Sequence, residues 1–323
     1  MTIASTERGA GKAVLANILG RFAPIVVFAA LLFLFGAIQP SFLSAYSLRV
    51  LAGESSIILV LAIGQTLVIL LGGIDLSMAA LASLTSVLLA LALPVAGAPG
   101  LIGVLLLATL IGAAQGYIHA RAQIPSFIVT LAGMGLFSGA ALVIGHTTII
   151  LQGGYEAVSW LSGRILGVPR PFAFAVGLLL VLLAALRWLP LGRHIYAIGL
   201  GELGALLSGV KVARTKIAVF AVSGLCAGLA GMMFVARTHS GNPTIADSLL
   251  LPSIAAVVVG GSAITGGVGG LMRTLVGTLT IGVLRVGMAV VGLDPAYEPI
   301  AYGILIAGAV AFTIDRSKTG IVK

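Results

Sequence analysis

Long apolar runs separated by short polar or Gly/Pro-containing connections dominate the chain. Runs of about 18 residues or more can cross the hydrocarbon core of a bilayer as helices. The pattern predicts about ten membrane helices, at residues 22–38, 48–71, 76–93, 101–118, 126–145, 171–189, 217–236, 248–260, 274–291 and 297–314. The expected fold class is therefore an all-α polytopic membrane protein, with one transmembrane domain over residues 1–323.

Two of these predicted helices are expected to be broken. Segment 48–71 is interrupted by Gly53-Glu54-Ser55-Ser56 and again by Gly64-Gln65-Thr66, and segment 248–260 is short and runs into GGSAITGGVGG. Interrupted hydrophobic segments in corresponding positions indicate a transporter pathway. The strings LVILLGGIDL and AAVVVGGSAI are weakly similar, and because the two segments belong to units that start on opposite sides, they indicate a possible inverted repeat.

Composition strengthens the membrane assignment. The chain is 59% hydrophobic and 8% charged, whereas a soluble domain carries about 25% charged residues. The 44 glycines and the unbroken apolar runs favour packed helices over a β-barrel. The single cysteine, Cys226, excludes an intrachain disulfide framework, and the four histidines are too far apart to predict a metal site.

The formal charge of +9 could indicate a nucleic-acid partner, but the basic residues lie in connections between apolar runs. Thirteen of the 18 Lys and Arg residues fall on the side of the N-terminus and four on the other side. The positive-inside rule explains this bias without a nucleic acid and predicts that both termini are cytoplasmic. Residues 1–21, 191–216 and 315–323 would then form a cytoplasmic head, loop and tail.

Arg285 lies within a predicted helix, where a charge needs a partner or a watery neighbour. Asp294 or Glu298 could approach it from the outer end of the bundle. A structural role, as an arginine that reaches the interface from a tilted helix or pairs across a subunit contact, is the alternative. Glu54 is expected near the same outer surface.

The candidate functional stretch is 64–80, which places four polar residues around Gly72-Gly73 in an apolar region: Gln65, Thr66, Asp75 and Ser77. Polar side chains at membrane depth usually face a protein interior or a watery path. We therefore predict that these four line the translocation path or its gate. The alternative is structural, with Asp75 or Ser77 capping a helix that opens at Leu76.

No nucleotide site is expected in this chain. A phosphate-binding loop ends in Gly-Lys-Ser/Thr, and the nearest string, Gly9-Ala10-Gly11-Lys12-Ala13, has no hydroxyl residue at its end. A transporter of this kind uses an ion gradient or the ATP hydrolysis of another chain. No catalytic residue is predicted.

Several motifs resemble one known family. The strings are GQTLVILLGGIDLS (64–77), PSFIVTLAGM (125–134), LGRHIYAIG (191–199), LSGV (207–210), AGLAGMMFVAR (227–237) and IAAVVVGGSAITGGVGG (254–270). Together they closely resemble permease subunits of ribose-type monosaccharide ABC importers. The resemblance implies a homodimeric pore similar to the vitamin B12 importer class in a bacterial cytoplasmic membrane. It also implies two cytoplasmic ATPase subunits, which use ATP and Mg²⁺, and an extracytoplasmic sugar-binding protein.

The resemblance also gives the basic loop 191–216 a function. In this family a short coupling helix, with a pattern close to Gly-Asn-Glu-Ala-Ala-x-x-x-Ser-Gly-Ile, docks on the ATPase. Ser208, Gly209 and Val210 match this pattern, and Glu202 matches it if Gly201 replaces the Asn. The coupling residues predicted from the resemblance are Glu202, Ala205, Ser208 and Gly209. The chain departs from the pattern at Leu203, Gly204 and Leu206, and glycine weakens a helix by about 1 kcal/mol relative to alanine.

The sequence therefore predicts a pore subunit that conducts a monosaccharide such as ribose, xylose or galactose and is not itself an enzyme. An ion-coupled secondary transporter of a small polar solute is the alternative, although Asp75, Arg285 and Glu54 supply few titratable groups for it. An intramembrane enzyme would need a nucleophile–base pair or metal ligands, and neither is evident. A purely structural scaffold is the remaining class.

Overall fold

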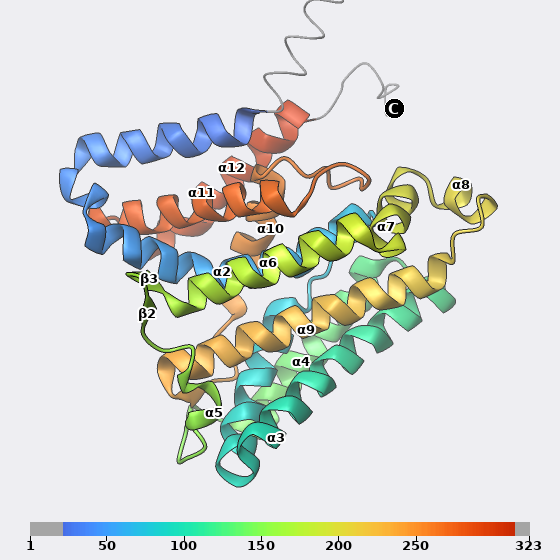
Figure 1. Ribbon diagram of the computed structural model, residues 1–323, viewed down its shortest axis with the longest axis horizontal. Helices are drawn as coiled ribbons and strands as arrows, with labels where there is room; N and C mark the ends of the chain where they lie inside the picture. Colours follow the sequence, from blue (N-terminus) through green and yellow to red (C-terminus); the bar gives the residue numbers. More distant parts are fainter. Residues whose placement is uncertain (1–21, 314–323) are drawn as a thin grey trace, which may run out of the picture.

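The computed structural model describes residues 22–313, which form a helical bundle (Figure 1). The predicted head 1–21 and tail 315–323 lie outside the described residues. The first helix spans Phe22–Ile38. The others are α2 (Ala45–Leu70), α3 (Met78–Arg121), α4 (Ser126–Gly145), α5 (Glu156–Ser159), α6 (Arg170–Trp188), α7 (Pro190–Leu200), α8 (Glu202–Leu207), α9 (Val212–Thr238), α10 (Leu250–Val259), α11 (Leu271–Val290) and α12 (Glu298–Thr313).

Short elements occupy the connections. Three 3₁₀ turns are η1 (Pro40–Leu43), η2 (Asp247–Leu249) and η3 (Pro295–Tyr297). Two small antiparallel pairs join β1 (Ile149–Ile150) to β4 (Ser240–Gly241) and β2 (Arg164–Ile165) to β3 (Val168–Pro169). The all-α membrane class is confirmed: within residues 22–313, six helices are long and apolar enough to cross a bilayer, and three apolar helices are shorter. A count of ten spans remains a prediction.

Helix α2 forms the centre of the bundle. Every residue from Ser55 to Leu70 is buried, and the helix packs against α6, α9, α10 and α11. The predicted breaks at Gly53-Glu54-Ser55-Ser56 and Gly64-Gln65-Thr66 are wrong, because α2 is one continuous helix. Gly64 serves packing instead: a Cβ there would press on the Met78 and Cys226 side chains, so glycine lets neighbouring elements approach closely.

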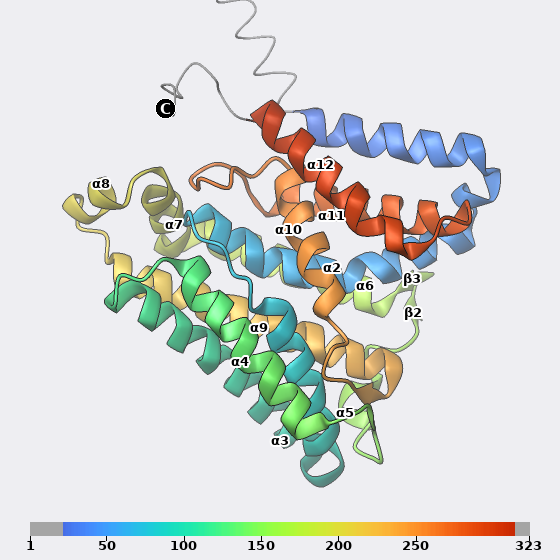
Figure 2. The ribbon, with the colours of Figure 1, turned by 180° about the vertical axis from the view of Figure 1, so that it is seen from behind.

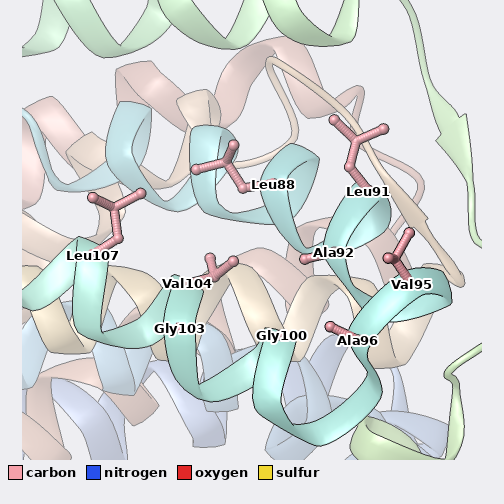
Figure 3. Close-up of a pocket in the computed structure, with 9 residues that line it drawn as sticks. All are labelled: Leu88, Leu91, Ala92, Val95, Ala96, Gly100, Gly103, Val104 and Leu107. Atoms are coloured by element: carbon pink, nitrogen blue, oxygen red, sulfur yellow. The ribbon is translucent and has the colours of Figure 1, made fainter.

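Helix α3 is a helical hairpin rather than one rod. Gly97 adopts φ 53° and ψ −129° between Pro94 and Pro99, and divides the 44 residues into two arms. These arms agree with the predicted segments 76–93 and 101–118. Figure 3 shows side chains from both arms around an apolar hollow of about 500 Å³ near the turn. Helix α9 packs on the hairpin where Gly112 meets Gly224, since a Cβ at either glycine would collide with the other helix.

The two Gly-Gly segments that follow α2 and α10 touch each other. The Gly267 amide donates to the Leu70 carbonyl oxygen at 3.0 Å, and a Cβ on Gly266 would meet the Gly72 backbone at 2.7 Å. Helix α10 is only 10 residues long, as the short eighth segment predicted. The segment that directly follows the second string therefore lies against the first string, while an inverted repeat remains a prediction.

The predicted loop 191–216 is mostly helical, because α7 and α8 occupy its first part. In Figures 1 and 2, α7 and α8 lie at one end of the bundle and the β2–β3 pair lies at the other. We call these the α8 end and the β3 end.

Candidate translocation and coupling sites

Asp75 is buried, with 3% of its surface exposed, and its carboxylate is held by hydroxyl and amide donors. The Ser77 amide and hydroxyl donate to Oδ1 at 2.9 and 2.7 Å, and the Ser223 hydroxyl of α9 donates to Oδ2 at 2.7 Å. No Lys or Arg pairs with Asp75 within residues 22–313. A buried carboxylate without a cation depends on such hydrogen bonds.

The backbone of segment 71–77 is bonded to α4. The Ser126 hydroxyl accepts from the Ile74 amide at 3.0 Å, and the Thr130 hydroxyl accepts from the Leu76 amide at 3.1 Å. These side chains satisfy donors that would otherwise be orphaned in a non-helical segment. The helix after Asp75 opens at Met78 rather than at Leu76.

Gln115 completes the Asp75 cluster from the second arm of α3, where its Nε2 donates to the Ser77 hydroxyl at 3.0 Å. The Ser77 hydroxyl therefore accepts a hydrogen bond from Gln115 Nε2 and donates one to Asp75 Oδ1. Sequence reasoning missed Gln115 and Ser223, although both are polar residues within apolar runs, which is the signal that identified Asp75 itself.

Gln65 and Thr66 do not join this cluster. The Thr66 hydroxyl lies 2.6 Å from the Thr274 hydroxyl of α11 and donates to the Ala62 carbonyl oxygen on its own helix. Gln65 is fully buried, and neither of its amide atoms has a hydrogen-bond partner among the described residues. The structure thus brings Asp75 and Ser77 together and leaves Gln65 and Thr66 in separate surroundings on α2.

Helix α8 and the two residues after it carry the predicted coupling residues, and contacts stabilise both ends of the helix. Glu202 receives Lys216 Nζ on both carboxylate oxygens at 2.8 Å. At the other end Gly209 adopts φ 82°, and its amide and that of Val210 donate to the carbonyl oxygens of Leu206 and Ala205 at 3.0 Å. These two bonds form a Schellman C-cap, which requires the left-handed conformation that glycine adopts easily.

The outward face of α8 is apolar. Ala205 is buried beneath the helix, and the Ser208 hydroxyl donates back to the Gly204 carbonyl oxygen. The leucines around it are more than half exposed, at 74%, 70%, 56% and 81% for Leu200, Leu203, Leu206 and Leu207. An exposed cluster of apolar side chains of this kind is typical of a protein-binding site.

Helix α7 connects α8 to the two Gly-Gly segments. The Tyr196 hydroxyl donates to the Gly269 carbonyl oxygen at 3.1 Å. Gly199 lies directly against the Leu70 carbonyl oxygen and the Gly267 amide, so that a Cβ there would collide with both. Helix α7 thus joins α8 to the end of α2 and to the α10–α11 connection through close backbone contacts.

The β3 end carries a second polar group. Glu54 on α2 pairs with Arg237 on α9, and Arg285 lies 3.8 Å from Glu54 Oε2 and 3.6 Å from Glu298 Oε2. Of the two candidate partners of Arg285, Glu298 is confirmed and Asp294 is wrong, because the Asp294 side chain accepts from the Ala296 amide instead.

Within residues 22–313, no group of three or more His, Cys, Asp or Glu side chains could hold a metal ion. These residues carry instead a buried hydroxyl–carboxylate cluster, an exposed apolar face on α8 and a charged group at the β3 end.

Comparison of the sequence with known proteins identifies a family. Residues 47–310 match the family model described as "Branched-chain amino acid transport system / permease component". The chain belongs to this permease family. It is 34% identical over 308 residues to the ribose import permease protein of Bacillus subtilis, covering 94% of this chain and 95% of that protein.

Other permeases of the family are similar over comparable lengths. The ribose import permease protein of Escherichia coli K12 is 35% identical, over 91% of this chain and 93% of its own length. The fructose import permease protein of Rhizobium meliloti is 35% identical, over 89% of this chain and 83% of its own length. No solved structure matches the chain. The family membership agrees with a multi-pass membrane permease.

Proposed function

We propose that this chain is the permease subunit of an ATP-driven importer that moves a monosaccharide across the bacterial cytoplasmic membrane. Relatives named for ribose and fructose import match it over nearly the whole chain. The observation that carries the proposal is the exposed apolar face of α8, joined to the core by α7. This is the arrangement expected of a subunit driven by an ATPase on another chain.

Its partners follow from this assignment. Two copies of the chain form the pore in a fold similar to that of the vitamin B12 importer class. Both termini face the cytoplasm, where two ATP-binding subunits use ATP and Mg²⁺, and a sugar-binding protein delivers the solute on the opposite side. The basic residues gathered on one side of the membrane support this orientation.

In the proposed cycle, the ATPase holds the leucines of α8 as an anchor. The Gly209 cap and the buried Ala205 hold α8 in place, and only Gly201 separates it from α7, so a displacement of α8 moves α7 with it. Through Gly199, α7 pushes on the end of α2 and on the α10–α11 connection. ATP binding changes the populations of the two pore states, which requires that the ATPase hold α8 more tightly in one of them.

Gln65, Thr66, Asp75 and Ser77 are proposed to gate the path. All four are buried in the described conformation. Gln65 supports this role best, since its buried amide has no hydrogen-bond partner among the described residues. A group that pays this desolvation cost in one state can recover it in a state where water or a sugar hydroxyl reaches it.

The test is co-purification of the full chain from its native membranes. Leu203→Glu places a charge on the proposed ATPase contact without removing a buried group, so a soluble ATPase should be lost from the complex and ATP-dependent uptake with it. The matched control is Leu166→Glu at the β3 end, where the leucine is 100% exposed and the same change should leave both intact.

Two results would overturn the proposal. One is that no ATPase co-purifies with the unaltered chain. The other is uptake by the chain alone, in vesicles without ATP, which would favour an ion-coupled secondary transporter and assign Asp75 to ion coupling.

A further inference from the structure

A cavity of about 230 Å³ lies at the β3 end, between α2, α9, η2 and α11. Its apolar wall includes Ile57 and Phe234, and its polar wall includes Glu54, Arg237, Ser248 and Arg285. None of its lining residues belongs to the Asp75 cluster or to the apolar face of α8. An apolar hollow with a few convergent polar groups is the usual form of a small-molecule site.

Arg285 is the unusual member of this wall. Its side chain is only 30% exposed and sits between two carboxylates, yet the closest approaches, 3.6 and 3.8 Å, exceed hydrogen-bond length. Its guanidinium makes no hydrogen bond to another residue in the described part of the chain. A guanidinium carries five N–H donors, so Arg285 has donor capacity that a ligand could use.

The neighbouring groups complete the set of ligand-binding atoms. Glu54, which lines the cavity, accepts from Arg237 through Oε1, and its Oε2 makes no hydrogen bond to another described residue. Ser248 is exposed and lines the same wall. Donors and acceptors within one small volume suit adjacent hydroxyl groups, each of which both donates and accepts.

We propose that this cavity is a binding site for a neutral, polyhydroxylated solute the size of a single sugar. The site would receive the solute before it passes into the pore. This inference rests on the proposed function and adds to it a specific site and the residues that make it. The ligand would hydrogen-bond to Arg285 and Glu54 and lay an apolar face on Phe234.

Charge and size both select this class of ligand. Two arginines and two glutamates, Glu298 being the second, balance one another, so an anion such as phosphate would meet repulsion from the carboxylates as well as attraction. A volume of about 230 Å³ corresponds to seven or eight water molecules at ~30 Å³ each. That volume holds one sugar ring and is too small to enclose a disaccharide or a peptide.

The test is protection of an introduced cysteine from a membrane-impermeant maleimide, with the full chain in lipid nanodiscs. Ser248→Cys puts a thiol on the cavity wall, and the only native cysteine, Cys226, is buried and adds little background. The probes are D-ribose, D-allose and D-fructose, with sucrose and inorganic phosphate for size and charge. Thr147→Cys, exposed in the α4–β1 connection, is the matched control.

We expect at least one monosaccharide, at ten times its Kd, to slow labelling of Cys at position 248 about ten-fold, because only the unoccupied fraction reacts. Sucrose and phosphate should not protect, and labelling at position 147 should not change. Adding Arg285→Gln should abolish protection. Protection by phosphate equal to that by sugar, or protection that survives Arg285→Gln, would contradict the assignment.

The same sugars are tested for ATP-dependent uptake by the complete complex. Uptake without protection at position 248 would show that the cavity proposal is wrong and leave the proposed function intact. Protection without any associated ATPase would support the cavity and overturn the ATP-driven mechanism.

Discussion

The two ends of the bundle are held by different kinds of contact. Toward the α8 end, the backbone of Gly199 touches Leu70 and Gly267 directly, and Asp75 is fixed by hydroxyls. At the β3 end, the long side chains of Arg237 and Arg285 approach Glu54 and Glu298.

The difference bears on which end can move easily. Backbone groups in direct contact cannot shift without moving their neighbours, since protein interiors pack at crystal-like density. Charge pairs between long, partly exposed side chains are individually weak and can be replaced by water or a ligand. The α8 end is thus suited to transmit a displacement, and the β3 end is suited to open.

The largest expected effect is that of Gly199→Ala. The added methyl group collides with the Leu70 carbonyl and the Gly267 backbone, so α7 must separate from α2, at a cost of about 3 kcal/mol or more in the free energy of unfolding. Thermal unfolding of the full chain in detergent measures this. Gly204→Ala, five residues along and with open space around its Cβ position, should be neutral or stabilising. Equal midpoints for the two variants would contradict rigid backbone contact at Gly199.

Asp75→Leu should have the next largest effect. It leaves the Ser77 amide and the Ser223 hydroxyl without their acceptor in a buried site, which costs about 2–3 kcal/mol in the free energy of unfolding. Asp75→Asn keeps an acceptor oxygen toward Ser77, and the Ser223 hydroxyl can turn to accept from the amide, so the cost should be about 1 kcal/mol. The same thermal assay compares the two. If both lose stability equally, hydrogen bonding does not explain this cluster.

The smallest effect is expected for Glu54→Gln at the β3 end. It removes one partner of Arg237 and of Arg285 and should cost about 1 kcal/mol at low ionic strength. Because the Glu54 and Arg237 side chains are 22% and 51% exposed, added salt screens their interaction, and the difference from the unaltered chain should shrink near 1 M salt. The Asp75 variants should show no such salt dependence, and a salt effect of equal size at both ends would remove the distinction.

Much of the fold could be predicted from the sequence because lipid imposes a simple rule. Apolar runs long enough to span a bilayer predicted most of the helices. The hairpin turn at Gly97 also lies between two predicted segments. The breaks expected in α2 were wrong because glycine has two roles in membranes. Gly64 permits close packing on α9 without interrupting the helix, and sequence alone does not distinguish this role from a break.

The candidate site was only partly predictable. Asp75 was conspicuous because a carboxylate in an apolar region is rare, whereas Ser223 and Gln115 lie about 150 and 40 positions away and are joined to it only by tertiary packing. A contact between Arg285 and Glu298 was predictable, because the two residues lie on consecutive predicted helices. Its link to Glu54, which is far away in the sequence, was not.

The uncharged tip of the α3 hairpin affects how the chain inserts into a membrane. Residues 92–103 contain no charged residue, and the turn is made by Gly97 between two prolines. Carrying a charge across the hydrocarbon layer is the main obstacle to inserting a connecting loop. We therefore expect the two arms to cross together during biosynthesis as a single preformed unit, and a lysine placed at the tip to delay that crossing.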